Sequence, residues 1–381
     1  MYLRACCVAL IAFLLGCGES DVMDVMSVPD GGNVGEADAL VEVGCEDACY
    51  DFSAVDARLA ADDDKYLGYV YVAVNRGDRQ IYQYAAGGAT EDSIFDLASA
   101  TKWISGSVVL SLVDEGLVEL DDTVGTTLPI MSDNGKGDFS LRHGFSMSSG
   151  LYDESRPHTN SNLTLAQSVN VIATTTAVLF SPPGSQIAYD GKQMQVVGRV
   201  AEVVSGKDWR TLASEQVFSK CGMSASNYDV FGLNPAVAGG LSTSPADYLK
   251  FMKMVLDGGV CGDTRVLSQA MVDEMFVNQT NDAPVAHTYW ESNHPDYPYG
   301  KDDLRYGFGA WILAENPDTG IVEEITSPGA WGTFPWVDTK RGLHGIIATY
   351  IPLADGGFRR VLDSELAILS LIPVSYTHLR A

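Results

Sequence analysis

The chain is short of positive charge. Its 381 residues include 24 Lys and Arg against 50 Asp and Glu, which gives a formal net charge of −26. Such an acidic chain repels phosphate backbones and anionic headgroups, so we expect no nucleic-acid partner and no electrostatic docking on a membrane. Histidine is scarce as well, with six residues and no His-Glu-x-x-His spacing. The sequence therefore predicts no metal centre.

The motif Gly-x-Ser-x-Gly is missing too. Its absence argues against a Ser-His-Asp hydrolase in which the serine sits on a nucleophile elbow. We therefore expect His143, in "LRHGFSMSSG", to be a buried, hydrogen-bonded residue and not a member of a catalytic triad.

The apolar run near the N-terminus is too short to span a membrane, which takes roughly 20 residues. It follows one Arg and ends at Leu14-Leu15-Gly16-Cys17. This pattern is typical of a bacterial lipoprotein signal, in which residues 1–16 are removed and Cys17 takes a lipid. We expect a protein held at the cell envelope by that lipid, in the periplasm or on the cell surface. A plain secretion signal is the alternative.

The acidic excess is concentrated behind this signal. Residues 18–64 hold fourteen Asp and Glu against one Arg, and residues 17–47 have the composition of a solvated tether. We place one domain at residues 48–373. Residues 374–381 do not continue the helical pattern before Pro373, and we interpret them as non-native read-through.

Seven cysteines are present, of which Cys6, Cys7 and Cys17 belong to the signal. The other four form an even number, which suits disulfides in an oxidising compartment. We expect a local pair, Cys45–Cys49, and a second pair, Cys221–Cys261, that brackets a helix-rich segment. Half of a metal site at Cys-x-x-x-Cys is the alternative for the first pair.

Strand patterns occur at both ends of the domain. Two β-branched and aromatic runs flank residues 75–78, which predicts a hairpin in a sheet that starts near residue 68. Strand patterns return from residue 305 onward. The fold class is therefore predicted to be α+β, with an antiparallel sheet that combines N- and C-terminal segments and is flanked by helices.

The segment between these strands is mainly helical. "SATKWISGSVVLSLVDEG", residues 99–116, is apolar on nearly all sides and predicts a buried helix that ends at Gly116. Helical patterns continue from 117 to about 260, and a last helix is expected at 361–372. These patterns predict a helical insert between two halves of one sheet.

The buried helix contains the chain's single Ser-x-x-Lys sequence, at Ser99 and Lys102. A serine in the first helical turn faces free N–H groups and the positive end of the helix dipole, which favour a developing negative charge. Lys102 follows one turn later on the same face. The pair is therefore a candidate nucleophile and base. A polar residue that merely caps the helix is the alternative for Ser99.

Five ordered stretches resemble the serine β-lactamase-related family, which includes class C β-lactamases, esterases and DD-peptidases (penicillin-binding proteins). They are "FDLASATKWISG", "SLRHGFSMSSGLYD", "PGSQIAYDGKQMQVVGRVAEVVSG", "AGGLSTSPADYLKFMKMVLDGG" and "SPGAWGTFPWVDTKRGL". The resemblance covers about residues 52–371. It implies a β-lactamase/transpeptidase-like fold and an acyl-enzyme mechanism without a metal or organic cofactor.

By this resemblance Ser99 attacks a substrate carbonyl, Lys102 lies beside it, and Tyr189 moves a proton to the leaving group. Lys (pKa ~10.4) and Tyr (pKa ~10) are both protonated in neutral water, so one of them must be perturbed to act as the base. The sequence leaves open which one it is. A packing role is the alternative for Tyr189, and we expect Asp190 to be a turn or cap residue.

The resemblance also implies an oxyanion hole built from the backbone N–H groups of Ser99 and Ala330. Ala330 follows the third motif, Ser327-Pro328-Gly329. Trp331, Trp336 and the loop at residues 289–300 are candidates to line an acyl pocket, or the loop is a plain surface insertion.

Two motif positions depart from the family pattern. Gly191 stands where β-lactamases carry the amide of Tyr-x-Asn, and Ser327 stands where the family usually has Lys, His or Trp. A neutral hydroxyl lacks the positive charge that pairs with a β-lactam carboxylate. We therefore expect a serine hydrolase whose partner is a small-molecule ester or amide, with carboxylic esters favoured. A D-Ala-D-Ala peptidase or β-lactamase, and a non-catalytic binding module, are the alternatives.

Overall fold

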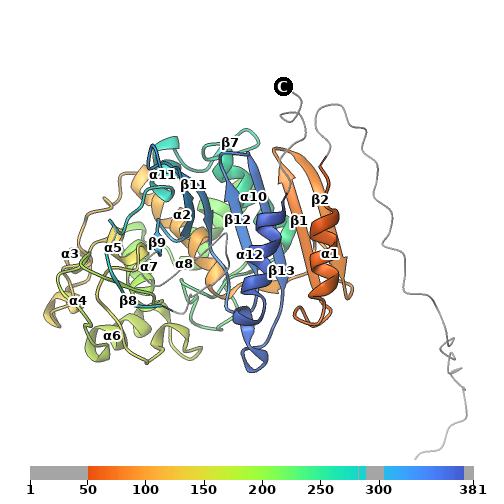
Figure 1. Cartoon of the computed structure of the whole chain (residues 1–381). Helices are drawn as coiled ribbons and strands as arrows, with labels where there is room; N and C mark the ends of the chain where they lie inside the picture. Colours follow the sequence, from red (N-terminus) through yellow and green to blue (C-terminus); the bar gives the residue numbers. More distant parts are fainter. Residues whose placement is uncertain (1–49, 282, 289–303, 373–381) are drawn as a thin grey trace, which may run out of the picture. The chain divides into compact units, whose positions relative to one another are not determined.

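A seven-stranded antiparallel sheet organises the domain (Figure 1). The computed structural model describes residues 50–281, 283–288 and 304–372. The strand order is β2-β1-β13-β12-β11-β10-β9, so the sheet combines N-terminal and C-terminal strands as predicted. The strands of this sheet are β1 (Val70–Arg76), β2 (Arg79–Ala86), β9 (Arg305–Tyr306), β10 (Trp311–Glu315), β11 (Val322–Thr326), β12 (Phe334–Asp338) and β13 (Leu343–Thr349).

Several expectations lie outside the described residues. These are the signal at residues 1–16 with the lipid site Cys17, the tether at 17–47, the Cys45–Cys49 pair, the loop at 289–300 and the read-through at 374–381. Within the described ranges, no helix is both long enough and apolar enough to cross a membrane.

The two ends of the domain meet in the middle of the sheet. β1 pairs with β13 along its whole length, from Val70 opposite Thr349 to Arg76 opposite Leu343. β1 and β2 form the predicted hairpin, and Gly77 adopts the left-handed backbone (φ 56°) that its tight turn requires. Strands from opposite ends of the sequence therefore depend on each other for their backbone hydrogen bonds.

Helices cover both faces of the sheet. Every residue of β12 and β13 is buried, which an antiparallel strand with one solvated face would not show. α1 (Ser53–Ala61) and α12 (Leu362–Leu371) pack together in front of the sheet in Figure 1. α10 (Pro245–Leu256) packs on β12 and β13 from the other side.

The remaining helices form the insert that the sequence predicts, together with short strands. The helices are α2 (Thr101–Asp114), α3 (Val124–Thr127), α4 (Pro129–Asp133), α5 (Leu141–Phe145), α6 (Leu165–Thr175), α7 (Lys192–Ser205), α8 (Trp209–Ala213), α9 (Ser219–Cys221) and α11 (Gln269–Met275). The shorter helical turns of the insert are η1 (Ala98–Ala100), η2 (Pro157–Thr159) and η3 (Ser214–Phe218), whereas η4 (Leu353–Asp355) and η5 (Gly357–Arg360) follow β13. The short strands are β3 (Phe95–Asp96), β4 (Ile187–Ala188), β5 (Ser242–Thr243), β6 (Val260–Cys261), β7 (Thr264–Arg265) and β8 (Val285–His287).

The central helix α2 is buried from Thr101 to Leu112, as its apolar pattern on all sides indicates. The prediction that this helix begins at Ser99 is wrong in one respect. Ser99 lies in the 3₁₀ turn η1 that leads into α2. The first turn is tighter than the rest of the helix, and such 3₁₀ turns are common at the ends of α-helices.

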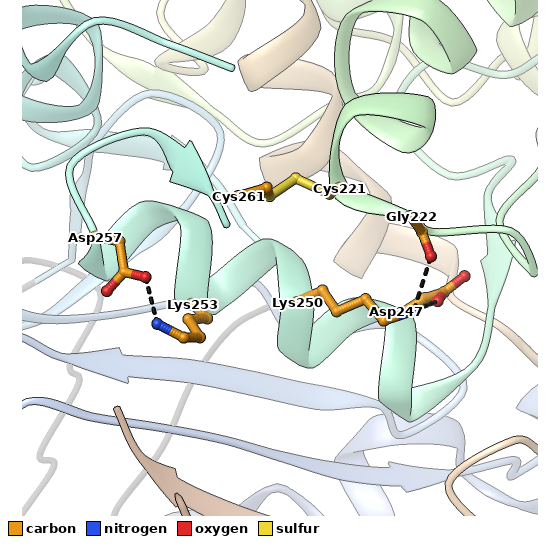
Figure 2. Close-up of a disulfide and its surroundings, with 7 residues drawn as sticks. All are labelled: Cys221, Gly222, Asp247, Lys250, Lys253, Asp257 and Cys261. Atoms are coloured by element: carbon orange, nitrogen blue, oxygen red, sulfur yellow. Dashed lines mark hydrogen bonds and ion pairs between the residues drawn. A yellow bond between two sulfur atoms is a disulfide. The ribbon is translucent and has the colours of Figure 1, made fainter. Parts of the chain in front are cut away.

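A disulfide joins Cys221 at the end of α9 to Cys261 in β6, with 5.1 Å between the two Cα atoms. This is the second pairing that the sequence predicts. Figure 2 shows it beside α10, where Lys250 Nζ donates to the carbonyl oxygen of Gly222 at 2.8 Å and Lys253 pairs with Asp257. The cross-link ties the end of the helical insert to the segment that follows α10.

Candidate active site

A cavity of about 440 Å³ brings together residues that are far apart in the sequence. Ser99, Lys102, Tyr189, Ala330 and Trp331 all line it. They come from the η1 turn, the start of α2, the segment after β4 and the segment after β11. The chain therefore folds so that its three motif regions share one site.

The turn that carries Ser99 is fixed by the segment before α10. Leu97 N–H donates to the carbonyl oxygen of Leu241 at 2.9 Å, and the Tyr248 hydroxyl donates to the carbonyl oxygen of Ala100 at 2.8 Å. Ala98 adopts φ 45°, a left-handed conformation that costs a non-glycine residue roughly 1–3 kcal/mol. These contacts hold a strained turn that presents the Ser99 hydroxyl to the cavity.

Lys102 is buried, with 4% of its surface exposed. Its Nζ lies 2.8 Å from Ser99 Oγ and 2.8 Å from the carbonyl oxygen of Ala238. Burial lowers the pKa of Lys102 to about 7, and the nearby charge of Asp190 offsets part of that decrease. A large fraction of Lys102 is therefore a neutral amine at pH 7, which can accept the Ser99 proton.

Tyr189 is held both by packing and by a hydrogen bond. Its ring stacks on Trp311 with centroids 5.1 Å apart, and Lys102 Nζ lies 4.9 Å from its centroid. Burial raises the pKa of Tyr189 well above its usual value, although hydrogen bonds with the side chains of Ser99 and Trp311 counter part of this. The phenol therefore stays protonated, so of the two candidates Lys102 is the one suited to be the base.

The third motif packs directly on the turn that carries Ser99. A Cβ on Gly329 would lie 2.1 Å from the carbonyl oxygen of Leu97, so a side chain at this position would push the two segments apart. Within the described part of the chain, neither the Ser99 N–H nor the Ala330 N–H has an acceptor. Two free N–H groups at one cavity are what an oxyanion hole requires.

Ser327 is buried, and its hydroxyl does not serve the cavity. Its Oγ donates to the carbonyl oxygens of Ser99 at 3.1 Å and Gly309 at 3.3 Å. Ser327 therefore fixes the backbone of Ser99 and does not line the cavity.

Of the three remaining candidate residues, one lines the cavity and two have structural roles. Trp331 lines the cavity, whereas Trp336 is fully buried in the core on β12. His143 is half-buried and completes a capping box with Ser140 at the start of α5, which agrees with the hydrogen-bonded role that the sequence predicts.

The sequence did not point to Lys192, which is fully buried at the start of α7. Its Nζ lies 2.8 Å from Asp190 Oδ2 and 3.4 Å from Asp153 Oδ1. It also donates to the carbonyl oxygens of Asp153 and Ser155 at 2.7 and 2.8 Å. Lys192 therefore ties the loop at 153–155 to the segment that carries Tyr189.

Asp190 is the turn residue that the sequence predicts. Its Oδ1 accepts a hydrogen bond from the Lys192 N–H at 2.7 Å. Burial raises the pKa of the Asp190 carboxyl, and the contacts with Lys192 lower it in part.

His158, on η2, is a second cavity residue that the sequence did not single out. A lone histidine in a polar loop carries no periodic or spacing signal that could have revealed it. Among the described residues, no three His, Cys, Asp or Glu side chains are grouped as a metal site would require.

Comparison with known proteins gives the family. A family model described as Beta-lactamase matches residues 55–356. Penicillin-binding protein 4 from Amycolatopsis lactamdurans is 24% identical over 301 residues, which cover 68% of this chain and 78% of that protein.

Solved structures show the same fold. A protein from Bacteroides dorei DSM 17855, provisionally named as a β-lactamase, is 27% identical with a TM-score of 0.73, over 85% of this chain and 99% of that one. EstCE1, described as a hydrolase with promiscuous acyltransferase activity, is 18% identical with a TM-score of 0.63, over 82% of this chain and 97% of that one. The predicted β-lactamase/transpeptidase-like fold is thus confirmed, and the chain belongs to the β-lactamase family of serine hydrolases, which includes esterases and penicillin-binding proteins.

Proposed function

We propose that this protein is a serine hydrolase that forms an acyl-enzyme at Ser99 and acts on carboxylic esters. The observation that carries this proposal is the contact of 2.8 Å between Ser99 Oγ and Lys102 Nζ inside the cavity. An amine whose pKa is lowered to about 7 is partly neutral at pH 7, and the neutral form activates a hydroxyl, which is a weak nucleophile at its own pKa.

In the first step Ser99 Oγ attacks the ester carbonyl carbon while Lys102 Nζ takes the hydroxyl proton. The carbonyl oxygen becomes an oxyanion between the N–H groups of Ser99 and Ala330. Each such donor is worth roughly 3 to 4 kcal/mol in related sites.

The tetrahedral intermediate then expels the alcohol. Tyr189 gives its phenolic proton to the leaving oxygen, and the ammonium of Lys102 restores that proton. Water next attacks the carbonyl carbon of the acyl-enzyme, and Lys102 and Tyr189 transfer the protons as before. This step releases the carboxylic acid and regenerates Ser99.

The cavity has an apolar side that suits the hydrocarbon part of an ester. Trp331, Leu353 and Phe358 line it, and Leu353 is 62% exposed. Tyr350 extends this surface because its ring lies 5.9 Å from that of Trp331. Exposed apolar groups beside a nucleophile favour an acyl or alkyl chain as ligand.

Two features make a β-lactam a poorer fit. Ser327 uses its hydroxyl on backbone carbonyls and supplies no cation, and Gly191 offers no side-chain amide. One observation favours the alternative of a D-Ala-D-Ala peptidase or β-lactamase: Arg156 and Arg359 line the cavity, and a guanidinium pairs well with a carboxylate.

The test compares purified wild type with Ser99→Ala. We expect wild type to hydrolyse nitrophenyl butyrate and to be labelled by a fluorophosphonate probe, and we expect the variant to do neither. Labelling that survives in Ser99→Ala would show that another residue is the nucleophile. A folded wild type that stays unlabelled would favour a non-catalytic binding module.

A chromogenic cephalosporin and a D-Ala-D-Ala peptide complete the experiment. Turnover of either without ester turnover would reverse the order of the two enzyme hypotheses.

We also propose that the enzyme works at the cell envelope, anchored by a lipid on Cys17. The disulfide Cys221–Cys261 supports this because such bonds persist in oxidising compartments. Cells fed radiolabelled palmitate should incorporate label into wild type and not into Cys17→Ser. Equal labelling of both would overturn the anchor.

A further inference from the structure

His158 occupies space that residue 191 leaves empty. A Cβ on Gly191 would lie 2.7 Å from Cδ2 and 2.9 Å from Nε2 of His158, too close for both side chains to remain in place. The backbone of Gly191 (φ −80°, ψ −16°) is one that any residue adopts. The same Cβ would also lie 3.0 Å from Cβ of Ala238. Side-chain contacts, the nearest of them with the His158 ring, therefore explain the glycine, and the backbone does not.

Gly191 occupies the third position of the Tyr-x-Asn motif, where β-lactamases of the family carry a side-chain amide. In this chain an imidazole from η2 stands where that amide side chain would begin. His158 and Gly191 both line the cavity that holds Ser99. A hydrogen-bonding group therefore lies near the nucleophile, but a different part of the chain supplies it.

Hydrogen bonds fix the loop on both sides of His158. Asn234 Nδ2 donates to the carbonyl oxygens of Pro157 and Asn160, both at 3.3 Å. Lys192 Nζ donates to the carbonyl oxygen of Ser155 at 2.8 Å. Because these bonds exist in the free protein, the ring needs little further ordering when a ligand binds.

The ring is neutral and available for hydrogen bonding. Burial lowers the pKa of His158 to about 3, and the charges of Lys192 and Lys102 add to the decrease. A neutral imidazole offers one donor and one acceptor. Its Nδ1 is cut off from solvent and has no partner among the described residues, so Nε2, which lies against Gly191, is the nitrogen that can meet a ligand.

We propose that His158 is a specificity-determining residue whose Nε2 forms a hydrogen bond with a hydroxyl or amide group on the acyl chain of the substrate. The substrate class is thereby narrowed to esters of polar-substituted carboxylic acids. This inference rests on the proposed function, because the acyl chain is placed by its bond to Ser99.

The experiment measures kcat/KM for nitrophenyl butyrate and nitrophenyl β-hydroxybutyrate and takes the ratio of the two values. In His158→Ala we expect the preference for the hydroxy ester to fall about five- to tenfold, the worth of one neutral hydrogen bond. His158→Gln restores a neutral donor and acceptor and should recover most of the preference.

Gly191→Ala tests the same idea without changing the ring. Its methyl group would clash most closely with the His158 ring and would also lie 3.0 Å from Cβ of Ala238. Displacement of the ring should lower the preference in the same way as His158→Ala. Because the imidazole is neutral in both conditions, the preference of wild type should be equal at pH 6 and pH 8.

A ratio within twofold of wild type in a folded His158→Ala, or an unchanged ratio in Gly191→Ala, would overturn the role of His158. Fluorophosphonate labelling of Ser99 is measured on the same samples. Labelled protein with an unchanged ratio rejects only the specificity proposal, whereas unlabelled wild type rejects the proposed function itself. Melting curves identify any variant that is not folded. If one of the three variants fails to fold, the ratios measured for the other two variants decide whether His158 sets the preference.

Discussion

Lys102 and Lys192 are both buried, with 4% and 0% of their surfaces exposed, yet their surroundings differ. Lys102 contacts two neutral oxygens, Ser99 Oγ and the carbonyl oxygen of Ala238. Lys192 contacts two carboxylates, those of Asp190 and Asp153, as well as carbonyl oxygens. Both lysines lie at the start of a helix, but Lys192 contacts carboxylates directly, whereas Asp190 acts on Lys102 without an ion-pair contact among the described residues.

The difference shows how one fold can place the same residue type as the proposed base, Lys102, and as an anchor, Lys192. An ammonium taken out of water without a counter-charge is destabilised, so its pKa falls. Carboxylates beside a buried ammonium compensate its charge and make the group a cross-link. Replacing each lysine by methionine, which keeps an unbranched side chain one atom shorter and removes the charged group, tests this contrast.

The largest effect is expected for Lys102→Met. Loss of the base should lower kcat/KM for nitrophenyl butyrate by about 10⁴-fold, measured in steady state. Retention of more than a tenth of wild-type activity would mean that another group deprotonates Ser99.

Although Lys102→Met should lose activity, its thermal stability should not fall below that of wild type. The pKa of Lys102 is about 7 in the folded state and higher in the unfolded state, so between these values the unfolded chain binds more protons and stability rises with pH. At pH 7 the wild type bears the cost of burying this amine, which the variant lacks. We expect the variant to melt at or above the melting temperature of wild type at pH 7. The difference between the two melting temperatures should become smaller as the pH rises towards 10.

Lys192→Met should destabilise the fold. Removal of the cation leaves the Asp190 carboxylate buried without a partner of opposite charge, at a cost of about 3 to 5 kcal/mol, measured by urea unfolding. Lys207→Met is the matched control, because Lys207 and Glu215 form an exposed pair whose loss should hardly move the unfolding midpoint. Equal midpoints for Lys192→Met and wild type would show that Lys192 is not an anchor.

Tyr189→Phe keeps the stacking on Trp311 and removes the proton donor. We expect kcat/KM to fall by about 10²-fold, with little change in melting temperature. Tyr306→Phe serves as control, since the Tyr306 hydroxyl is buried without a partner among the described residues, and its turnover should stay close to wild type. If both variants behave alike, Tyr189 has a packing role.

The smallest effect is the pH dependence of wild type. Because the neutral amine of Lys102 is the active form, kcat/KM should rise about tenfold per pH unit below pH 7 and level off above it. Rates corrected for spontaneous hydrolysis from pH 5 to 9 provide the measurement. A profile that falls as pH rises through 7 would rule out Lys102 as the base.

The sequence predicted the parts of the site that have local signals. Ser99 and Lys102 are one turn apart on an apolar helix, and the hairpin around residues 75–78 has its own turn chemistry. The start of α2 was placed too early, because the tight 3₁₀ turn at Ser99 depends on contacts with Leu241 and Tyr248.

Residues whose roles depend on distant partners gave no such signal. Lys192 is an anchor because Asp153 lies beside it, and His158 reaches the cavity because Gly191 lacks a side chain. Trp331 and Trp336 look alike in sequence, but Trp336 lies on β12, whose residues are all buried, whereas Trp331 lies on the segment before β12 and lines the cavity.

The sequence by itself determined the fold class and the order of the motifs and predicted the candidate nucleophile and base, because apolar periodicity, turn residues and helical spacing are local properties of the chain. Only the tertiary structure decided that burial lowers the pKa of Lys102, which carbonyl oxygens the Ser327 hydroxyl contacts and which side chain lies beside Gly191. Each of these depends on burial and on contacts between segments far apart in the chain, and those quantities exist only once the chain is folded.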